Sequence, residues 1–185
     1  MSLTPSNMIS LGTIAPEFKL NDGIDSQFQK LNDLNGENGT LIVFICNHCP
    51  YVIHILKHWV DFSNSLINKK INTIAISSND IINYPEDSPE LMKKLSLEYN
   101  FKFPYLFDSD QSVAKKYDAA CTPDFYLFDS KLCLYYRGRY DKSRPNNSDE
   151  LNGNDLKNAV NSMLEKKQFN QTQYPSLGCN IKWKN

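Results

Sequence analysis

The chain has little of what marks fibrous, membrane-spanning or polyanion-binding proteins. Of its 185 residues only seven are glycine and nine are proline, too few for a collagen-like or low-complexity chain. The longest apolar run covers only residues 41–46, far short of the ~20 residues that span a bilayer. Basic and acidic residues number 20 and 21, so the net charge is −1 and no nucleic-acid partner is expected. We therefore expect one globular domain over residues 1–185, away from membranes, with a sizeable core.

Arginine is scarce, and its positions are uneven. Arg137, Arg139 and Arg144 are the only arginines among the 20 basic residues, and they lie close together in the chain. Two interpretations are open: a composition biased toward lysine in which a few arginines remain, or a local clamp for an anion or a carboxylate. The clamp would use the fixed fork of donors that a guanidinium has and an ammonium lacks.

Two further signals are missing. The first ten residues, MSLTPSNMIS, have no positive segment followed by an apolar one, so a secretory leader is not expected. Neither G-x-G-x-x-G nor G-x-x-x-x-G-K-[ST] occurs, so no organic cofactor is expected. The five cysteines are an odd number in a chain of this kind, which favours reduced thiols and a cytoplasmic location over a disulfide scaffold.

Hydrophobic periodicity predicts an α/β fold. Residues 41–45 form a continuous β-branched and aromatic run, typical of a strand buried on both faces. Residues 50–69 carry apolar side chains at helical spacing, and residues 124–128 and 131–136 predict a hairpin. The other predicted elements are strands at 17–20, 71–76 and 104–107, a turn at 21–23, and helices at 88–99, 111–117 and 154–167. Together they predict a mixed central sheet with helices on both faces, followed by a tail at 170–185.

The reactive chemistry is expected where the strand at 41–45 meets the helix at 50–69. The segment CNHCP lies there, and Cys49 falls at the expected start of the helix. Unpaired amide groups and the positive end of the helix dipole favour a thiolate at this place. A thiolate is the form that attacks a disulfide or a peroxide, and Cys46 can reach Cys49 across a tight turn. The C-x-x-C therefore indicates a redox motif, against the alternative of two ordinary small residues at a turn.

A metal site is an alternative for the same segment. Cys46, His48 and Cys49 offer soft and borderline ligands, and His54 and His58 follow on the predicted helix. The two helix histidines belong to a polar stripe opposite the predicted core face, so we expect them to be solvated. No functional metal site is therefore predicted.

Seven segments, spread over nearly the whole chain, point to a known family. They are LGTIAPEF at 11–18, NHCPYV at 47–52, ISSND at 76–80, YPEDSPE at 84–90, CTPDF at 121–125, YRGR at 136–139 and GCNIKWK at 178–184. Together they resemble the thioredoxin superfamily, and within it the redoxin or peroxiredoxin-like (AhpC/TSA-type) proteins. The resemblance implies a thioredoxin-like fold with an N-terminal extension. It also implies that Thr122–Pro123 is similar to the cis-proline element that faces the active cysteine in such proteins.

The resemblance places the family nucleophile at Cys49. Counting from the strand aromatic Phe44, as in thioredoxins, puts the first active-site cysteine at Cys49 and the second at Val52, where this chain has no cysteine.

The partner of Cys49 must then be another cysteine, and three alternatives are open. Cys46 is nearest in sequence. Cys121 comes just before Thr122–Pro123, the element similar to the family's cis-proline element, and Cys179 lies on a tail that can fold back. Cys133, in the predicted hairpin, is expected to be a small buried hydrophobic residue.

A second departure from the family concerns peroxidase chemistry. Peroxiredoxins carry the pattern P-x-x-x-T-x-x-C and a later arginine. In this chain Ile42 stands in place of the proline and Cys46 in place of the threonine, and the position of the later arginine aligns near Pro123. Arg139 and Thr122 are the candidate substrate-binding residues. The resemblance thus implies a thiol-disulfide oxidoreductase, acting on a disulfide or peroxide with a reducing thiol partner. A hydroperoxide reductase is the alternative enzyme, and a metal-binding or thiol-sensing protein is the non-enzymatic alternative.

Overall fold

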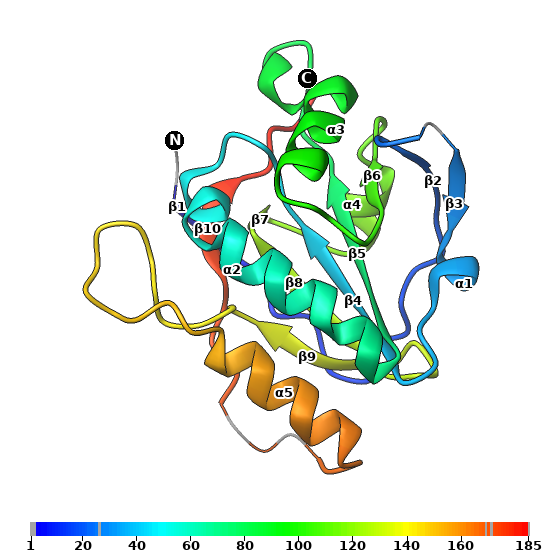
Figure 1. Ribbon diagram of the computed structural model, residues 1–185, viewed down its shortest axis with the longest axis vertical. Coiled ribbons are helices and arrows are strands. Elements are labelled where there is room, and N and C mark those ends of the chain that lie inside the picture. Colours follow the sequence, from blue (N-terminus) through cyan, green and yellow to red (C-terminus); the bar gives the residue numbers. More distant parts are fainter. Residues whose placement is uncertain (1–2, 26, 169, 171, 185) are drawn as a thin grey trace.

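A mixed sheet of seven strands forms the centre of the fold in the computed structural model, which describes residues 3–25, 27–168, 170 and 172–184 (Figure 1). Residues 171 and 185 of the predicted tail lie outside this described part. The strand order is β3-β2-β6-β5-β4-β8-β9, and the inner strands β4, β5 and β6 run parallel. The strands are β2 (Lys19–Asp22), β3 (Phe28–Lys30), β4 (Gly39–Phe44), β5 (Ile71–Ser77), β6 (Tyr105–Phe107), β8 (Asp124–Phe128) and β9 (Leu134–Gly138).

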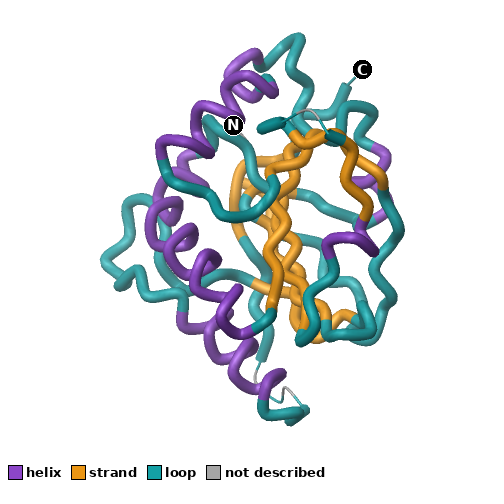
Figure 2. Tube along the Cα trace, turned by 45° about the vertical axis from the view of Figure 1, so that its right-hand side comes forward, coloured by secondary structure: helices purple, strands orange, loops and turns teal. Residues whose placement is uncertain are grey.

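Helices cover both faces of this sheet (Figure 2). One face packs on α2, α3 and α5, and the other packs on the short helices α1 and α4. The predicted mixed sheet with helices on both faces is therefore confirmed. The helices are α1 (Leu31–Leu34), α2 (Pro50–Leu66), α3 (Pro89–Glu98), α4 (Ser112–Lys116) and α5 (Asn154–Leu164), with 3-10 turns at Ile67–Lys69 and Pro85–Asp87.

Strand β4 explains why its sequence is apolar without alternation. All six of its residues are buried. Because successive side chains of a strand point to opposite faces, Leu41 and Val43 join one core cluster while Ile42 and Phe44 join the other. β5 and β8 pair with its two edges, so β4 lies inside the sheet and delivers the chain directly to Cys46.

A second, smaller sheet was not predicted. It has the order β1-β10-β7, with β1 (Leu3–Pro5), β7 (Cys121–Thr122) and β10 (Leu177–Asn180). β10 lies within the predicted tail and pairs antiparallel with both neighbours. Its sequence LGCN has neither alternation nor β-branched residues, so only long-range pairing reveals it as a strand.

Three side-chain predictions are wrong. His54 Nε2 lies 3.0 Å from Ser143 Oγ and His58 Nδ1 lies 2.6 Å from Tyr140 Oη, so both histidines are half-buried rather than solvated. The reason is that the loop after β9 packs over α2. Cys133 is half-buried rather than fully buried, because it lies beside the hairpin turn.

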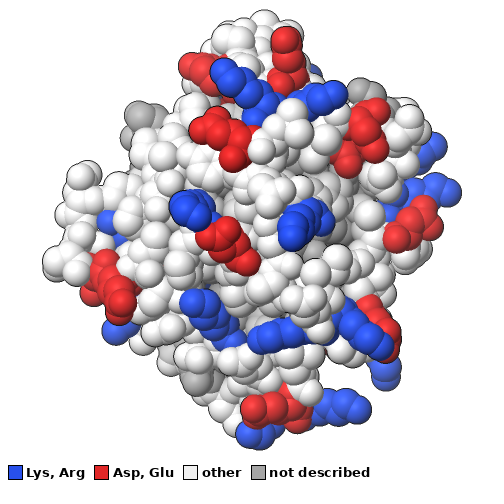
Figure 3. Space-filling view, in the orientation of Figure 1, with Lys and Arg blue, Asp and Glu red and all other residues white. Residues whose placement is uncertain are grey.

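Acidic and basic side chains are interspersed over the face drawn in Figure 3, in keeping with the net charge of −1. Among the described residues, none of the helices combines the length and the apolar character needed to cross a membrane.

Helix α2 should depend on its buried face for stability. Leu56 is 1 % exposed and Ile53, on the same helix, is 53 % exposed. We expect Leu56→Ala to lower the free energy of unfolding by about 2–5 kcal/mol, because it removes buried methyl groups and leaves a cavity. Ile53→Ala, the matched control, should cost less than about 1 kcal/mol. Urea unfolding measures both; equal losses would contradict this packing.

Candidate active site

Cys49 stands at the start of α2. It is the N-cap residue, with extended backbone angles (φ −69°, ψ 121°), and Pro50 begins the helix. A proline fits this first position because its missing N–H would have no partner in the helix anyway. The position puts the Cys49 sulfur at the positive end of the helix dipole, as the sequence predicted. The side chain is fully buried.

Two other thiols flank Cys49. Cys46, from the turn after β4, donates a hydrogen bond to the Cys49 sulfur, and so does Cys179 of β10. Thr122 contacts both members of the C-x-x-C motif. In its protonated form Cys49 donates to the Thr122 carbonyl oxygen, 3.1 Å from Sγ, and Cys46 Sγ lies 3.5 Å from Thr122 Oγ1. The structure thus brings four of the predicted site residues together.

These contacts divide the protons unequally among the thiols. The pKa of Cys49 is lowered to about 5, mainly because Cys46 donates a hydrogen bond to its sulfur; Thr122 and the backbone N–H groups of Cys179 and Val52 act in the same direction. The same hydrogen bond, together with burial, raises the pKa of Cys46 well above its ordinary value. Burial and the hydrogen bond to Cys49 raise the pKa of Cys179 to about 12. At neutral pH the negative charge therefore lies on Cys49.

Cys121 is close to the site but has a different partner. Its thiol donates to the Pro123 carbonyl oxygen, 3.7 Å away, and burial is the main reason that its pKa is raised. The Thr122–Pro123 peptide bond is cis, as the resemblance implied.

A buried carboxylate, overlooked in the sequence, holds the C-x-x-C turn. Asp87 Oδ1 accepts from the Asn47 backbone N–H at 2.7 Å, and Oδ2 accepts from the Asn79 side chain at 2.8 Å. His48 Nδ1 lies 2.8 Å from the same Oδ2, and the imidazole stacks on Tyr84 with ring centres 5.7 Å apart. The YPEDSPE segment thus anchors the turn that carries Cys46 and Cys49. No pattern in the sequence indicates this role, because an aspartate is expected to be exposed to solvent.

The same residues are the ones that could hold a metal ion. Cys46, His48 and Asp87 offer ligand atoms that all lie within 4.8 Å of one another. Both carboxylate oxygens of Asp87 already accept hydrogen bonds, so an ion here would compete with the anchoring of the turn.

An ion pair lies directly behind the cis-proline. Arg137 Nη2 is 3.0 Å from Asp124 Oδ2, both side chains are fully buried, and the guanidinium lies 3.9 Å from the centre of the Tyr126 ring. Burial outweighs the attraction of Arg137 and raises the pKa of Asp124 to about 6. An unpaired charge buried here would be costly in free energy, so the two side chains stay together. The pair therefore links β9 to β8, the strand that follows the cis-proline.

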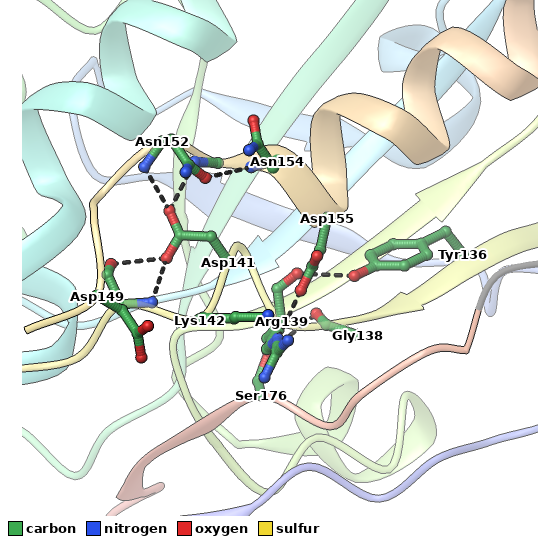
Figure 4. A network of polar contacts seen from close by, with 12 residues as sticks. Tyr136, Gly138, Arg139, Asp141, Lys142, Asp149, Asn152, Asn154, Asp155 and Ser176 are labelled. Carbon is green, nitrogen blue, oxygen red and sulfur yellow. Dashed lines mark hydrogen bonds and ion pairs between the residues drawn. The ribbon is translucent and has the colours of Figure 1, made fainter. Parts of the chain in front are cut away.

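Arg139 is held by a carboxylate of this chain. Its Nε is paired with Asp155 of α5 (Figure 4), and its guanidinium lies 4.3 Å from the centre of the Tyr174 ring. Together with Tyr51, Pro123 and other residues it lines a small cavity of about 30 Å³. Arg137 and Arg139 therefore each bind a different carboxylate of this chain, and the clamp for an external anion stays a prediction.

The fold of the chain is thioredoxin-like. The AhpC/TSA family model matches residues 11–137, and the chain belongs to this family.

Among solved structures, the chain is similar to an uncharacterized conserved protein from Geobacillus kaustophilus, with 48 % identity over 100 % of this chain and 97 % of that one and a TM-score of 0.97. It is also similar to a hypothetical protein from Sinorhizobium meliloti, with 41 % identity over 98 % of each chain and a TM-score of 0.95. Peroxidoxin BcpB from Mycobacterium tuberculosis shares the fold, at 14 % identity over 86 % of this chain and 98 % of that one and a TM-score of 0.63. No curated protein matches the chain.

The lowered pKa of Cys49 can be measured by pH titration of the thiolate ultraviolet absorbance. In the difference between wild type and Cys49→Ser, the thiolate should appear as the pH rises through about 5. Cys46→Ala removes the main donor and should move the midpoint upward by a unit or more, whereas Cys46→Ser keeps a hydroxyl donor and should move it less. Cys133→Ser is the control and should leave it unchanged. A wild-type midpoint near the ordinary value of about 8.5 would contradict this account.

Proposed function

We propose that this protein is a thiol-disulfide oxidoreductase in which Cys49 is the nucleophile. The observation that supports the proposal most strongly is the convergence of hydrogen-bond donors on the Cys49 sulfur, which keeps it ionised at neutral pH. A thiolate is the attacking form in thiol–disulfide exchange, and the reactive cysteines of this chemistry lie in such surroundings.

In the proposed reaction, the Cys49 thiolate attacks one sulfur of a substrate disulfide. The S–S bond breaks, the other sulfur leaves as a thiolate, and Cys49 is held in a mixed disulfide. A second thiol of the protein then loses its proton and attacks the Cys49 sulfur, which releases the rest of the substrate as a second thiolate. The substrate gains two electrons, and a reducing thiol partner restores the protein disulfide to two thiols.

Cys46 and Cys179 are the proposed resolving thiols, with Cys46 first. Each donates a hydrogen bond to Cys49 while Cys49 is ionised, and this bond helps to keep the proton on the donor. Once Cys49 is in a mixed disulfide, its sulfur carries no negative charge. The hydrogen bond then no longer keeps the donor thiol protonated, and the resolving thiol can ionise. Cys121 is a less favourable candidate because its thiol donates to the Pro123 carbonyl.

Pro123 is a proposed catalytic residue, and Thr122 and Arg139 are the proposed substrate-binding residues. Thr122 contacts both thiols of the C-x-x-C motif, so a substrate sulfur that reacts with Cys49 would lie beside it. For Arg139 to bind a substrate, its guanidinium must leave Asp155.

A hydroperoxide reductase is the second candidate, and the complete burial of Cys49 favours it, because a peroxide is small. The Cys49 thiolate would attack one peroxide oxygen, break the O–O bond and become a sulfenic acid, while the other oxygen leaves as an alcohol or water after taking a proton. Condensation with the Cys46 or Cys179 thiol would then release water and form a disulfide. Either reaction uses only thiols as the reacting groups of the protein. Five cysteines without disulfide bonds fit a reducing compartment, and we propose that this compartment is the cytoplasm.

Replacement of Cys49 tests both reactions. With a dithiol donor present, consumption of a small disulfide and of hydrogen peroxide should fall to the uncatalysed rate in Cys49→Ser, because the thiol that attacks the substrate in the proposed reaction is removed. Cys133→Ser should keep full activity. If Cys49→Ser still turns over both substrates, the proposal is wrong. Stoichiometric bound zinc or copper in the purified protein, lost in Cys46→Ser and Cys49→Ser, would instead support a metal-binding protein.

A further inference from the structure

The nucleophile of the proposed reaction lies beneath the C-terminal strand. Cys49 is 0 % exposed and Cys179 of β10 is 4 % exposed. β10 pairs antiparallel with β7 so that Cys179 stands opposite Thr122, and both its backbone N–H and its thiol face the Cys49 sulfur. β10 therefore fills the place that a sulfur of another protein would have to occupy to react with Cys49.

This strand is held along both edges and at both ends. β1 pairs with one edge and β7 with the other. Before β10, Ser176 exchanges hydrogen bonds with Ser6, at 2.9 and 3.0 Å, and its hydroxyl donates to the Gly138 carbonyl. After it, the Lys182 N–H donates to Asn79 Oδ1 at 2.8 Å and the Lys182 carbonyl accepts from Gln111 at 2.8 Å. β10 is thus a built-in part of the site.

Gly178 sets how closely β10 approaches the cis-proline element. A Cβ at this position would lie 1.9 Å from the Thr122 carbonyl oxygen and 2.7 Å from the carbonyl carbon. Both contacts are with backbone, so no side chain can move aside to accept a methyl group. Only glycine fits here, and the carbonyl it packs on is the one that faces Cys49.

We propose that β10, seated by Gly178, determines the size of substrate that reaches Cys49: small oxidants are admitted and disulfides of folded proteins are excluded. An extended segment of a protein substrate would bind by adding to the edge of β7, and that edge is already paired. The cavity beside Pro123, Tyr51 and Leu177 has about 30 Å³, which is room for a molecule the size of water or peroxide. This inference rests on the proposed function, since it concerns access to the same nucleophile.

The test uses two oxidants of different size on the full chain. Hydrogen peroxide and insulin disulfides are the probes, and the rate constant of Cys49 oxidation is measured for each. Gly178→Ala should lift β10 from Thr122 and raise the rate with insulin at least about tenfold over wild type, while the peroxide rate changes by less than about threefold. Gly23→Ala is the matched control: its added methyl would lie 2.9 Å from the flexible end of Met92 and 3.1 Å from the Tyr105 carbonyl oxygen, outside β10, and both rates should stay at the wild-type values.

A milder variant covers the case in which Gly178→Ala does not fold, which circular dichroism and thermal unfolding would reveal. Ser176→Ala removes the hydrogen bond from the Ser176 hydroxyl to the Gly138 carbonyl, which helps to anchor the strand, but keeps Gly178, and it should raise the insulin rate in the same direction. If wild type reduces insulin as fast as the folded variants do, the inference is overturned and the proposed function stands. If Cys49 reacts with neither oxidant in any variant, the proposed function fails, and the inference fails with it.

Discussion

The structure depends on one constraint: a negative sulfur is buried at the start of α2 and needs hydrogen-bond donors. Burial alone would keep the Cys49 thiol protonated, yet its pKa is lowered to about 5 because donors converge on it. These donors come from the turn after β4, from the residue before the cis-proline, and from β10 near the C-terminus. Three distant parts of the chain must therefore meet, and the smaller sheet β1-β10-β7 is what brings the last of them to the site.

The same demand accounts for the rigid surroundings of the site. Asp87 fixes the C-x-x-C turn from one side, and the buried pair of Arg137 and Asp124 fixes the strand after the cis-proline from the other. A hydrogen bond to a thiolate is stronger when water is excluded, so enclosure and activation of Cys49 support each other. The consequence is an enclosed thiol at Cys49, and under the proposed function substrate size would become part of the selectivity of the site.

Local patterns in the sequence predicted the centre of the fold and the placement of Cys49 at the start of α2. The apolar run that became β4, the helical spacing of α2 and the proline at its start are all encoded within a few residues, and the motifs implied the cis-proline. What the sequence could not show depends on long-range contacts. β10 is a strand only because β1 and β7 pair with it, Asp87 is an anchor only because it folds beneath Asn47, and His54 is covered only because a distant loop crosses α2.

The most direct test of the central claim is a map of the disulfide formed when the reduced protein receives one equivalent of oxidant at neutral pH. Peptide mass spectrometry with the remaining thiols blocked would locate the bond. The account predicts that Cys49 is joined to Cys46 or to Cys179, with Cys121 and Cys133 still free, because only the first two thiols donate to the Cys49 sulfur. A bond that leaves Cys49 as a free thiol would contradict it.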